Sequence, residues 1–358
     1  MSWFIAFVGF AALVILHELG HFAAAKAVGM RVEKFSLFFG PFLAKFTRGE
    51  TTYGIGPIPL GGYVKITGMN PAEDIPPEHA HRAYYRQPVW KRVVVILAGP
   101  LVNIVLAFLI LWVVFWSNGI SEATSKVERV SPGTPAAQTL KPGDTLVAVD
   151  GRRGDFDALR AQIGTHTCAT TPPKDGCASA TPARVTVSRD GQRETFSLRP
   201  VFDAAAGQTI VGFTPAVLTT PIGPATAAGD SVEAMWRVTT ATATVLSRLF
   251  EAEQREQLSG VIGSYERTRQ SVEISATRTF LLLALISLSL GLINLLPFLP
   301  LDGGHIFWAV AEKLSGRKIS FAIMERASVI GIGLVAVLFF IGLQNDIGRL
   351  AGEGFGTP

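Results

Sequence analysis

Four long, almost uninterrupted runs of apolar residues divide the sequence. They cover Trp3–Val28, Val93–Trp116, Phe280–Leu296 and Ala327–Leu343. A helix of about 17 to 25 predominantly apolar residues crosses the hydrocarbon core of a bilayer, and each run is long enough for this. The pattern therefore predicts a mainly α-helical, polytopic membrane protein with four transmembrane helices, and the lipid bilayer is its first expected partner.

The overall composition agrees with this prediction. Hydrophobic residues make up 48% of the 358 residues, charged residues only 17%, and the mean hydropathy is +0.35. The formal net charge of +4 is modest, and the basic residues flank the apolar runs. A nucleic-acid-binding protein would instead gather its basic residues on a soluble domain, so we expect no nucleic acid as a partner.

The connections between the runs differ in charge. The segment Arg31–Arg92 holds nine basic residues against five acidic ones, and Lys313, Arg317, Lys318 and Arg326 make the connection before the last run basic as well. Short basic connections next to membrane spans lie in the cytoplasm. Four spans place these two connections on the same side, so the long polar segment Asn118–Arg278 is expected outside the cytoplasm.

Residues Thr51–Thr67 within the first basic connection combine β-forming residues with glycine and proline. This composition predicts a β-hairpin. It is too broken to cross the membrane as a helix, yet it is apolar enough to dip toward the spans and to offer an edge strand to an extended peptide. An ordinary surface hairpin is the alternative.

The outer segment predicts a small α+β domain over residues 120–202. Val127–Gly151 reads as a strand, a turn, a short helix and a strand, and Arg184–Leu198 reads as two strands joined at Asp190-Gly191. Cys168 and Cys177 lie in its Pro- and Thr-rich insertion. Because disulfides persist outside the cytoplasm, we expect these two cysteines to pair, with two free thiols as the alternative.

This domain divides the chain into four predicted parts. Residues 1–117 form a first membrane half, and residues 120–202 form the outer domain. Residues 203–278 form amphipathic linker helices, with 231–253 along the membrane surface. Residues 279–358 form a second membrane half.

The chemistry is concentrated in the first apolar run, where His17, Glu18 and His21 form the pattern H-E-x-x-H. With about 3.6 residues per helical turn, the two histidines project from one face, one turn apart, and can bind one metal ion. Glu18 can then act on a metal-bound water without being a ligand, which is the arrangement of zinc proteases. A hydrogen-bonded polar patch is the alternative, but ionisable groups at membrane depth are costly and usually functional.

A catalytic zinc ion usually needs a third protein ligand. Asp302 is the best candidate, because it follows the proline-broken end of the third apolar run and starts a short helix, Gly303–Leu314. It could instead only cap that helix. His305 is a competing ligand, and His305 and Asn294 are otherwise candidates for orienting a ligand or the substrate.

Gly99, Asn103 and Ala107 recur every four residues in the second apolar run and form a stripe on one face of the expected helix. Small residues allow helices to approach closely. We expect this stripe to pack against the histidine face, with Asn103 close to the site. Helix packing alone is an equally good interpretation.

Taken together, four stretches resemble the site-2 protease family. They are His17-Glu18-Leu19-Gly20-His21, Gly99-Pro100-Leu101-Val102-Asn103, Pro132 to Gly151, and Asn294 to Gly304 (N-L-L-P-F-L-P-L-D-G-G). The similarity is greatest to the bacterial group that cuts membrane-embedded anti-sigma factors and leftover signal peptides.

The resemblance implies an intramembrane zinc metalloprotease of the bacterial inner membrane, with its active site toward the cytoplasm. It implies that His17, His21 and Asp302 bind Zn²⁺, that Glu18 is the catalytic base and that Asn294 positions the substrate. It also implies that the outer domain is a PDZ domain, and that the substrates are single-span membrane proteins that another protease has already cut. A non-catalytic, PDZ-bearing membrane scaffold with a structural metal site is the alternative function.

Overall fold

The computed structural model describes residues 2–70, 73–168, 170, 173–203, 208–248, 260–317 and 319–351. These residues form two compact units. The first combines Met1–Trp116 with Gly223–Pro358, and the second is Ser117–Ile222.

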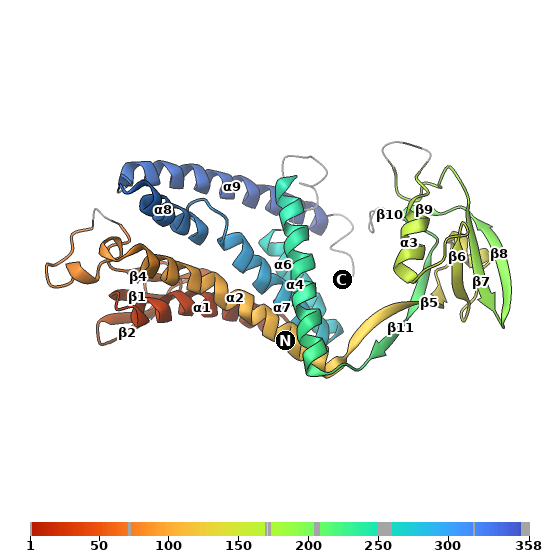
Figure 1. Ribbon diagram of the computed structural model, residues 1–358, viewed down its shortest axis with the longest axis horizontal. Helices are drawn as coiled ribbons and strands as arrows, with labels where there is room; N and C mark the ends of the chain where they lie inside the picture. The colour runs from red at the N-terminus through yellow and green to blue at the C-terminus, as the bar shows by residue number, and fades with distance from the viewer. Residues whose placement is uncertain are drawn as a thin grey trace. The chain divides into compact units, whose positions relative to one another are not determined.

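Four helices of the first unit are long and apolar enough to cross a membrane. They are α1 (Ser2–Ala27), α2 (Val89–Asn118), α7 (Ala276–Asn294) and α9 (Phe321–Ala351) (Figure 1). They confirm the four predicted spans, and the chain is a polytopic membrane protein. Arg326 lies inside α9 and not in the preceding connection, because Phe321–Ala351 contains no proline that would delay the start of the helix.

The described residues of the first unit form three further α-helices: α4 (Pro224–Ser247), α6 (Val261–Ile274) and α8 (Asp302–Ser315). The predicted surface helix 231–253 corresponds to α4 as far as Ser247, and its last residues lie outside the described part of the chain. The short helix expected from Gly303 is α8. It begins at Asp302, one residue earlier than expected, and residues 295–301 connect it to α7.

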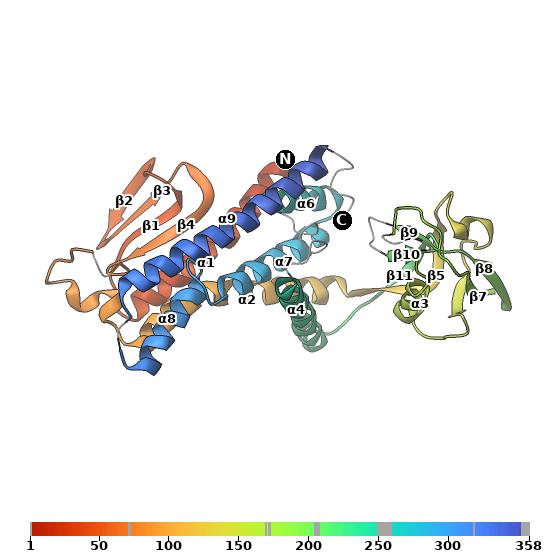
Figure 2. The same cartoon turned by 90° about the horizontal axis from the view of Figure 1, so that it is seen from above.

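A four-stranded sheet lies alongside α1 in the order β2-β3-β1-β4 (Figure 2). Its strands are β1 (Val32–Phe39), β2 (Ala44–Arg48), β3 (Thr51–Ile55) and β4 (Ile58–Ile66). Two short 3-10 helices, η1 (Ala80–Arg82) and η2 (Tyr84–Arg86), connect this sheet to α2.

The prediction of a β-hairpin over Thr51–Thr67 is wrong, because β1 lies between β3 and β4. Strand β1 is parallel to β3 and antiparallel to β4. The reason lies at Gly56, which donates its N–H to the carbonyl of Leu37 at 2.8 Å. This bond holds the connection after β3 against the end of β1. The chain therefore crosses the end of β1, and β4 pairs with the other side of that strand. The hairpin of this sheet is formed by β2 and β3.

The second unit contains an antiparallel five-stranded sheet in the order β11-β5-β6-β7-β8. Its strands are β5 (Ile120–Val130), β6 (Thr145–Val149), β7 (Ala183–Arg189), β8 (Gln192–Leu198) and β11 (Phe213–Thr220), and β9 (Val201–Asp203) pairs with β10 (Gln208–Ile210). The strands expected in Val127–Gly151 and Arg184–Leu198 are present, as is the turn at Asp190-Gly191.

Helix α3 (Phe156–Gly164) and the 3-10 helix η3 (Pro135–Gln138) also belong to this unit, whose core includes Leu159 of α3 and Val185 of β7. Strand β11 lies in the region assigned to linker helices, and its pairing with β5 extends the compact unit to Ile222. Cys168 and Cys177 are joined by a disulfide, with their Cα atoms 5.9 Å apart.

Candidate metal centre

The two histidines of α1 face each other at the centre of the first unit. Both are 7% exposed, their rings are nearly perpendicular, and their Nε2 atoms lie 3.3 Å apart. One helical turn separates them, so the helix itself sets this distance. Glu18, the next residue after His17, lines a neighbouring cavity and not the space between the histidines.

The connection after α7 brings Asp302 to these histidines. Its Oδ2 atom lies 3.2 Å from Nε2 of His17 and 3.2 Å from Nε2 of His21. The two glycines that follow Asp302 make this turn possible. A Cβ atom on Gly303 would overlap the carbonyl of Leu295, and one on Gly304 would overlap the backbone N of Leu299.

A backbone hydrogen bond fixes how His21 presents its ring. Its Nδ1 lies 2.9 Å from the carbonyl oxygen of Val95 on α2. A carbonyl oxygen only accepts, so Nδ1 carries the proton and a neutral His21 presents the lone pair of Nε2 to the cluster. Among the described residues, the buried Oδ2 atom of Asp302 receives no hydrogen bond. His21 thus turns an unprotonated ring nitrogen, and Asp302 a carboxylate oxygen, toward the point where Nε2 of His17 also lies.

These three atoms fit a zinc ion. Two imidazole nitrogens and a carboxylate oxygen are a usual ligand set for catalytic zinc, with metal–ligand distances of about 2.0–2.2 Å. A tetrahedron of that size has edges of about 3.3–3.6 Å, and the observed separations are 3.2 to 3.3 Å. Within the described part of the chain, this is the one group of three such side chains that could hold a metal ion.

Helix α2 approaches the histidines through its stripe of small residues. Gly99, Asn103 and Ala107 are all buried. A Cβ atom on Gly99 would overlap Nε2 of His21, and one on Gly20 of α1 would lie 2.6 Å from the carbonyl of Ala98. The stripe therefore does pack against the histidine helix. Glycine at position 99 leaves the space that the imidazole occupies.

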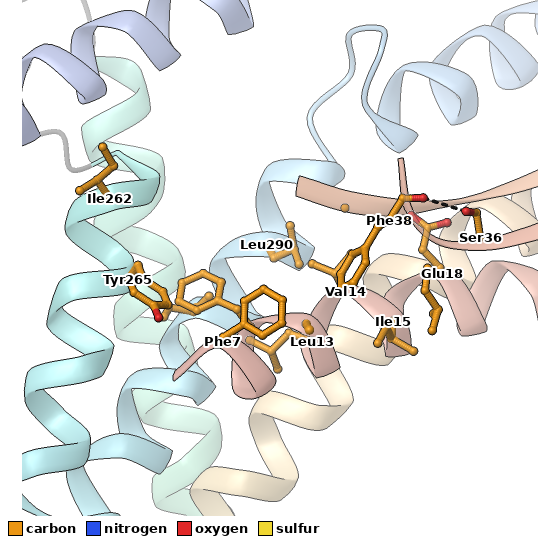
Figure 3. A pocket seen from close by; sticks show the side chains of 16 residues that line it. Phe7, Leu13, Val14, Ile15, Glu18, Ser36, Phe38, Ile262, Tyr265 and Leu290 are labelled. Atoms are coloured by element: carbon orange, nitrogen blue, oxygen red, sulfur yellow. Dashed lines mark hydrogen bonds between the residues drawn. The ribbon is translucent and has the colours of Figure 1, made fainter. Parts of the chain in front are cut away.

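A cavity of 420 Å³ opens beside Glu18 (Figure 3). It is lined mainly by apolar side chains of α1, α6 and α7, by residues near the end of β1 and by the middle of β4. Gly62 of β4 lies next to Glu18, since a Cβ atom there would be 3.1 Å from Cγ of Glu18. The carboxyl group of Glu18 thus stands between an apolar cavity and an edge strand of the sheet.

The remaining predicted residues do not belong to the cluster. Asn294 ends α7 and donates its Nδ2 hydrogen to the carbonyl of Leu290 at 3.0 Å. Asn103 is fully buried, and neither side-chain polar atom has a hydrogen-bond partner among the described residues. His305 lies one turn into α8, outside the group that could hold a metal, and burial lowers its pKa.

The sequence did not reveal two contacts that position the centre. One is the Val95 carbonyl, which any residue type could supply. The other is the ion pair between Arg92 of α2 and Glu312 of α8, with 3.0 Å between Nη1 and Oε2. Arg92 is only 8% exposed. The position of Arg92 at the edge of an apolar run could have indicated a buried ion pair, but nothing in the sequence identified Glu312 as its partner.

Comparisons with known proteins agree with this geometry. The profile of peptidase family M50 matches residues 5–338. A protein of Campylobacter jejuni named as a zinc metalloprotease is 30% identical, and the alignment covers 95% of this chain and 92% of the relative. A similarly named protein of Rhizobium meliloti is 30% identical, with 95% and 94% covered. The regulator of sigma-E protease RseP of Salmonella typhimurium is 27% identical, with 94% and 96% covered.

Proposed function

The chain belongs to peptidase family M50 and is a zinc metalloprotease, and from this premise we propose that it hydrolyses peptide bonds inside the transmembrane segments of single-span membrane proteins. The observation that carries the proposal is the meeting of His17, His21 and Asp302 at 3.2 Å. Two of these residues lie on a helix apolar enough to cross the membrane, and the third follows another such helix. A substrate must therefore be cut at or near membrane depth.

In this proposal His17, His21 and Asp302 hold the zinc ion and Glu18 is the catalytic base. A zinc ion held by these residues would supply Lewis-acid chemistry that lowers the pKa of a water molecule and polarises a peptide carbonyl. Glu18 accepts a proton from the attacking water and passes it to the amide nitrogen that leaves. The Val95 carbonyl keeps the His21 ring in the orientation that presents Nε2.

The substrate has to be unwound before it can be cut, because a helix hides its peptide groups in internal hydrogen bonds. In our proposal β4 binds the unwound, extended part of the substrate. This strand is at the edge of its sheet and lies against α1 beside Glu18. Pairing with an edge strand replaces the backbone hydrogen bonds lost on unwinding. We assign Asn294 and Asn103 to positioning the substrate. For Asn103 the assignment is supported by its side-chain amide, which has no hydrogen-bond partner among the described residues.

The substrates we propose are anti-sigma factors and remnant signal peptides from which another protease has removed the outer part. The name of the RseP relative supports the first class. The protein would lie in the bacterial inner membrane, with its active site toward the cytoplasm. The compact unit Ser117–Ile222 would be an extracytoplasmic PDZ domain that keeps out substrates with bulky outer domains.

Replacement of Glu18 by Gln tests the proposal. The chain or its Glu18→Gln variant is co-expressed with a panel of single-span proteins that lack most of their outer domains. We expect the wild type to release shortened products and Glu18→Gln to release none, while both bind the same amount of zinc. Glu233→Gln, a change at an exposed residue of α4, serves as the control.

Full cleavage by Glu18→Gln would exclude Glu18 as the base. Binding of the panel without cleavage by either form would indicate a scaffold.

A further inference from the structure

Phe38, at the end of β1, has a left-handed backbone conformation with φ = +73°. Bulky residues rarely adopt this conformation because the side chain meets the neighbouring backbone. The buried hydroxyl of Ser36 donates to the carbonyl oxygen of Phe38 at 2.7 Å and holds the turn. Glycine would adopt this conformation at lower conformational cost. A phenylalanine here points to a role for its ring.

The pairing of β1 with β4 is interrupted at the same residue. Leu37 pairs with Gly62 and Phe39 pairs with Ile58, so the register shifts across Phe38. Side chains normally alternate between the two faces of a strand, and an irregularity of this kind redirects one of them. Figure 3 shows Phe38 pointing from β1 into the cavity, toward Val14. Its ring centroid lies 6.1 Å from that of Phe7.

This cavity adjoins the catalytic base of the proposed reaction. Glu18 and Gly62 lie on its wall, and Ile262 and Tyr265 of α6 line it as well. Its volume of 420 Å³ is within the range of about 300–1,000 Å³ found for ligand pockets. A peptide held on β4 with its scissile bond at Glu18 would place a neighbouring side chain here. That side chain would pack against the ring of Phe38, which forms part of the cavity wall.

Resting on the proposed function, we propose that Phe38 is a specificity-determining residue. Its ring limits the size of the side chain that a substrate can place beside the scissile bond. The preferred substrate is then an apolar transmembrane segment whose side chain at that position fits the space beside the ring.

Two substitutions of Phe38 change the space in opposite directions. Phe38→Gly removes the ring and suits the positive φ, so the turn is retained. Phe38→Trp enlarges the ring. The matched control is Phe46→Ala, which removes an exposed ring of the same sheet that stacks on Tyr53 and does not line the cavity.

The probe is a single-span segment of about 20 residues, prepared in versions that carry Ala, Leu, Phe or Trp on either side of the mapped scissile bond. We expect wild type and Phe46→Ala to show the same order of preference among the four versions. Phe38→Gly should raise the ratio of kcat/KM for the Phe version over the Ala version by about tenfold or more, since a few methylene groups in an apolar pocket discriminate to this extent. Phe38→Trp should lower this ratio.

The same segments, titrated against each variant in a Glu18→Gln background, give the matching binding constants without catalysis. Parallel shifts in binding and cleavage support the assignment. Cleavage by the wild type with identical preferences in all variants overturns the role of Phe38 and leaves the proposed function standing. If the wild type cuts no version, the proposed function fails and the assignment fails with it.

Discussion

Nε2 of His21 and Oδ2 of Asp302 lie 3.2 Å apart, although the first residue belongs to the first membrane helix and the second follows the third. This contact links the two membrane halves of the chain at one buried point. Because both atoms present electron pairs, a cation between them satisfies both. A substitution that removes or displaces either atom should therefore weaken the binding of a metal ion.

Asp302→Asn should reduce zinc affinity strongly. The neutral amide keeps the shape of the side chain but is a much weaker zinc ligand than a carboxylate. Loss of a partner outside the ligand set typically costs about 10–100-fold in metal affinity, and loss of a ligand should exceed this. Competition with a chelator, followed by the zinc content, measures the effect. Asp74→Asn, at an exposed loop residue, is the control. Equal zinc affinity in both variants would remove Asp302 from the ligand set.

Gly99→Ala should displace His21. The added methyl group would overlap Nε2 of that imidazole, within a buried contact between α1 and α2. We expect loss of zinc and of proteolysis while the helices remain. Gly333→Ala is a matched control, because it also adds a methyl group within a membrane helix but has nothing within 4 Å. If Gly99→Ala retained zinc as well as Gly333→Ala does, the close approach of α2 would not matter.

Arg92→Gln should weaken the attachment of α8, the helix that Asp302 begins. Among the described residues, the Arg92–Glu312 pair is the one ion pair that joins α2 to α8. Because Glu312 is partly exposed, we expect a loss of roughly 1–3 kcal/mol in unfolding free energy, measured by denaturant titration in detergent. Zinc retention should fall as well.

Exchange of the two charges, Arg92→Glu with Glu312→Arg, should restore part of both losses. Arg237→Gln breaks an exposed pair at 4.0 Å and should change little. An Arg92→Gln variant with the stability and zinc content of Arg237→Gln would show that the pair does not support the site.

Glu50 should make the stability of the folded protein depend on pH in the acid range. Its hydrogen bonds with Arg82, and then with Lys26, lower its pKa from 4.5 to about 2. A carboxyl group whose pKa is lower in the folded state stabilises that state fully above its unfolded pKa. This stabilisation is lost as pH falls from about 4.5 toward 2.

Thermal unfolding between pH 6 and pH 2, in about half-unit steps, measures this contribution. Glu50→Gln should be less stable than wild type at neutral pH, and the difference should shrink toward pH 2. Glu78→Gln, a change at an exposed residue of the connection before η1, should run parallel to wild type. A Glu50→Gln curve parallel to wild type over the whole range would contradict the assignment.

The sequence predicted well those features that depend on residues close to one another in the chain. The four spans follow from uninterrupted apolar runs, and the spacing of His17 and His21 follows from helical geometry alone. The strands around Asp190-Gly191 follow from alternation and from a turn whose residues have φ of +49° and +81°. Asp302 was identified through a break in an apolar run. Each of these signals lies within a short stretch of sequence.

The features that the sequence missed depend on distant pairings. The order β2-β3-β1-β4 could not be read from Thr51–Thr67, because the strand that separates β3 from β4 precedes both. The pairing of β11 with β5 likewise joins the first and last strands of the five-stranded sheet along the chain. The left-handed turn at Phe38 contains no glycine from which the sequence could have predicted it. Long-range strand pairings decide the first two.

Zinc K-edge X-ray absorption of the purified chain tests the central claim most directly, namely that α1 and α8 hold one zinc ion together. The account predicts two imidazole nitrogens and a carboxylate oxygen at about 2.0–2.2 Å from zinc, with the carboxylate contribution lost in Asp302→Asn. A spectrum with three imidazoles, or one that Asp302→Asn leaves unchanged, would contradict it.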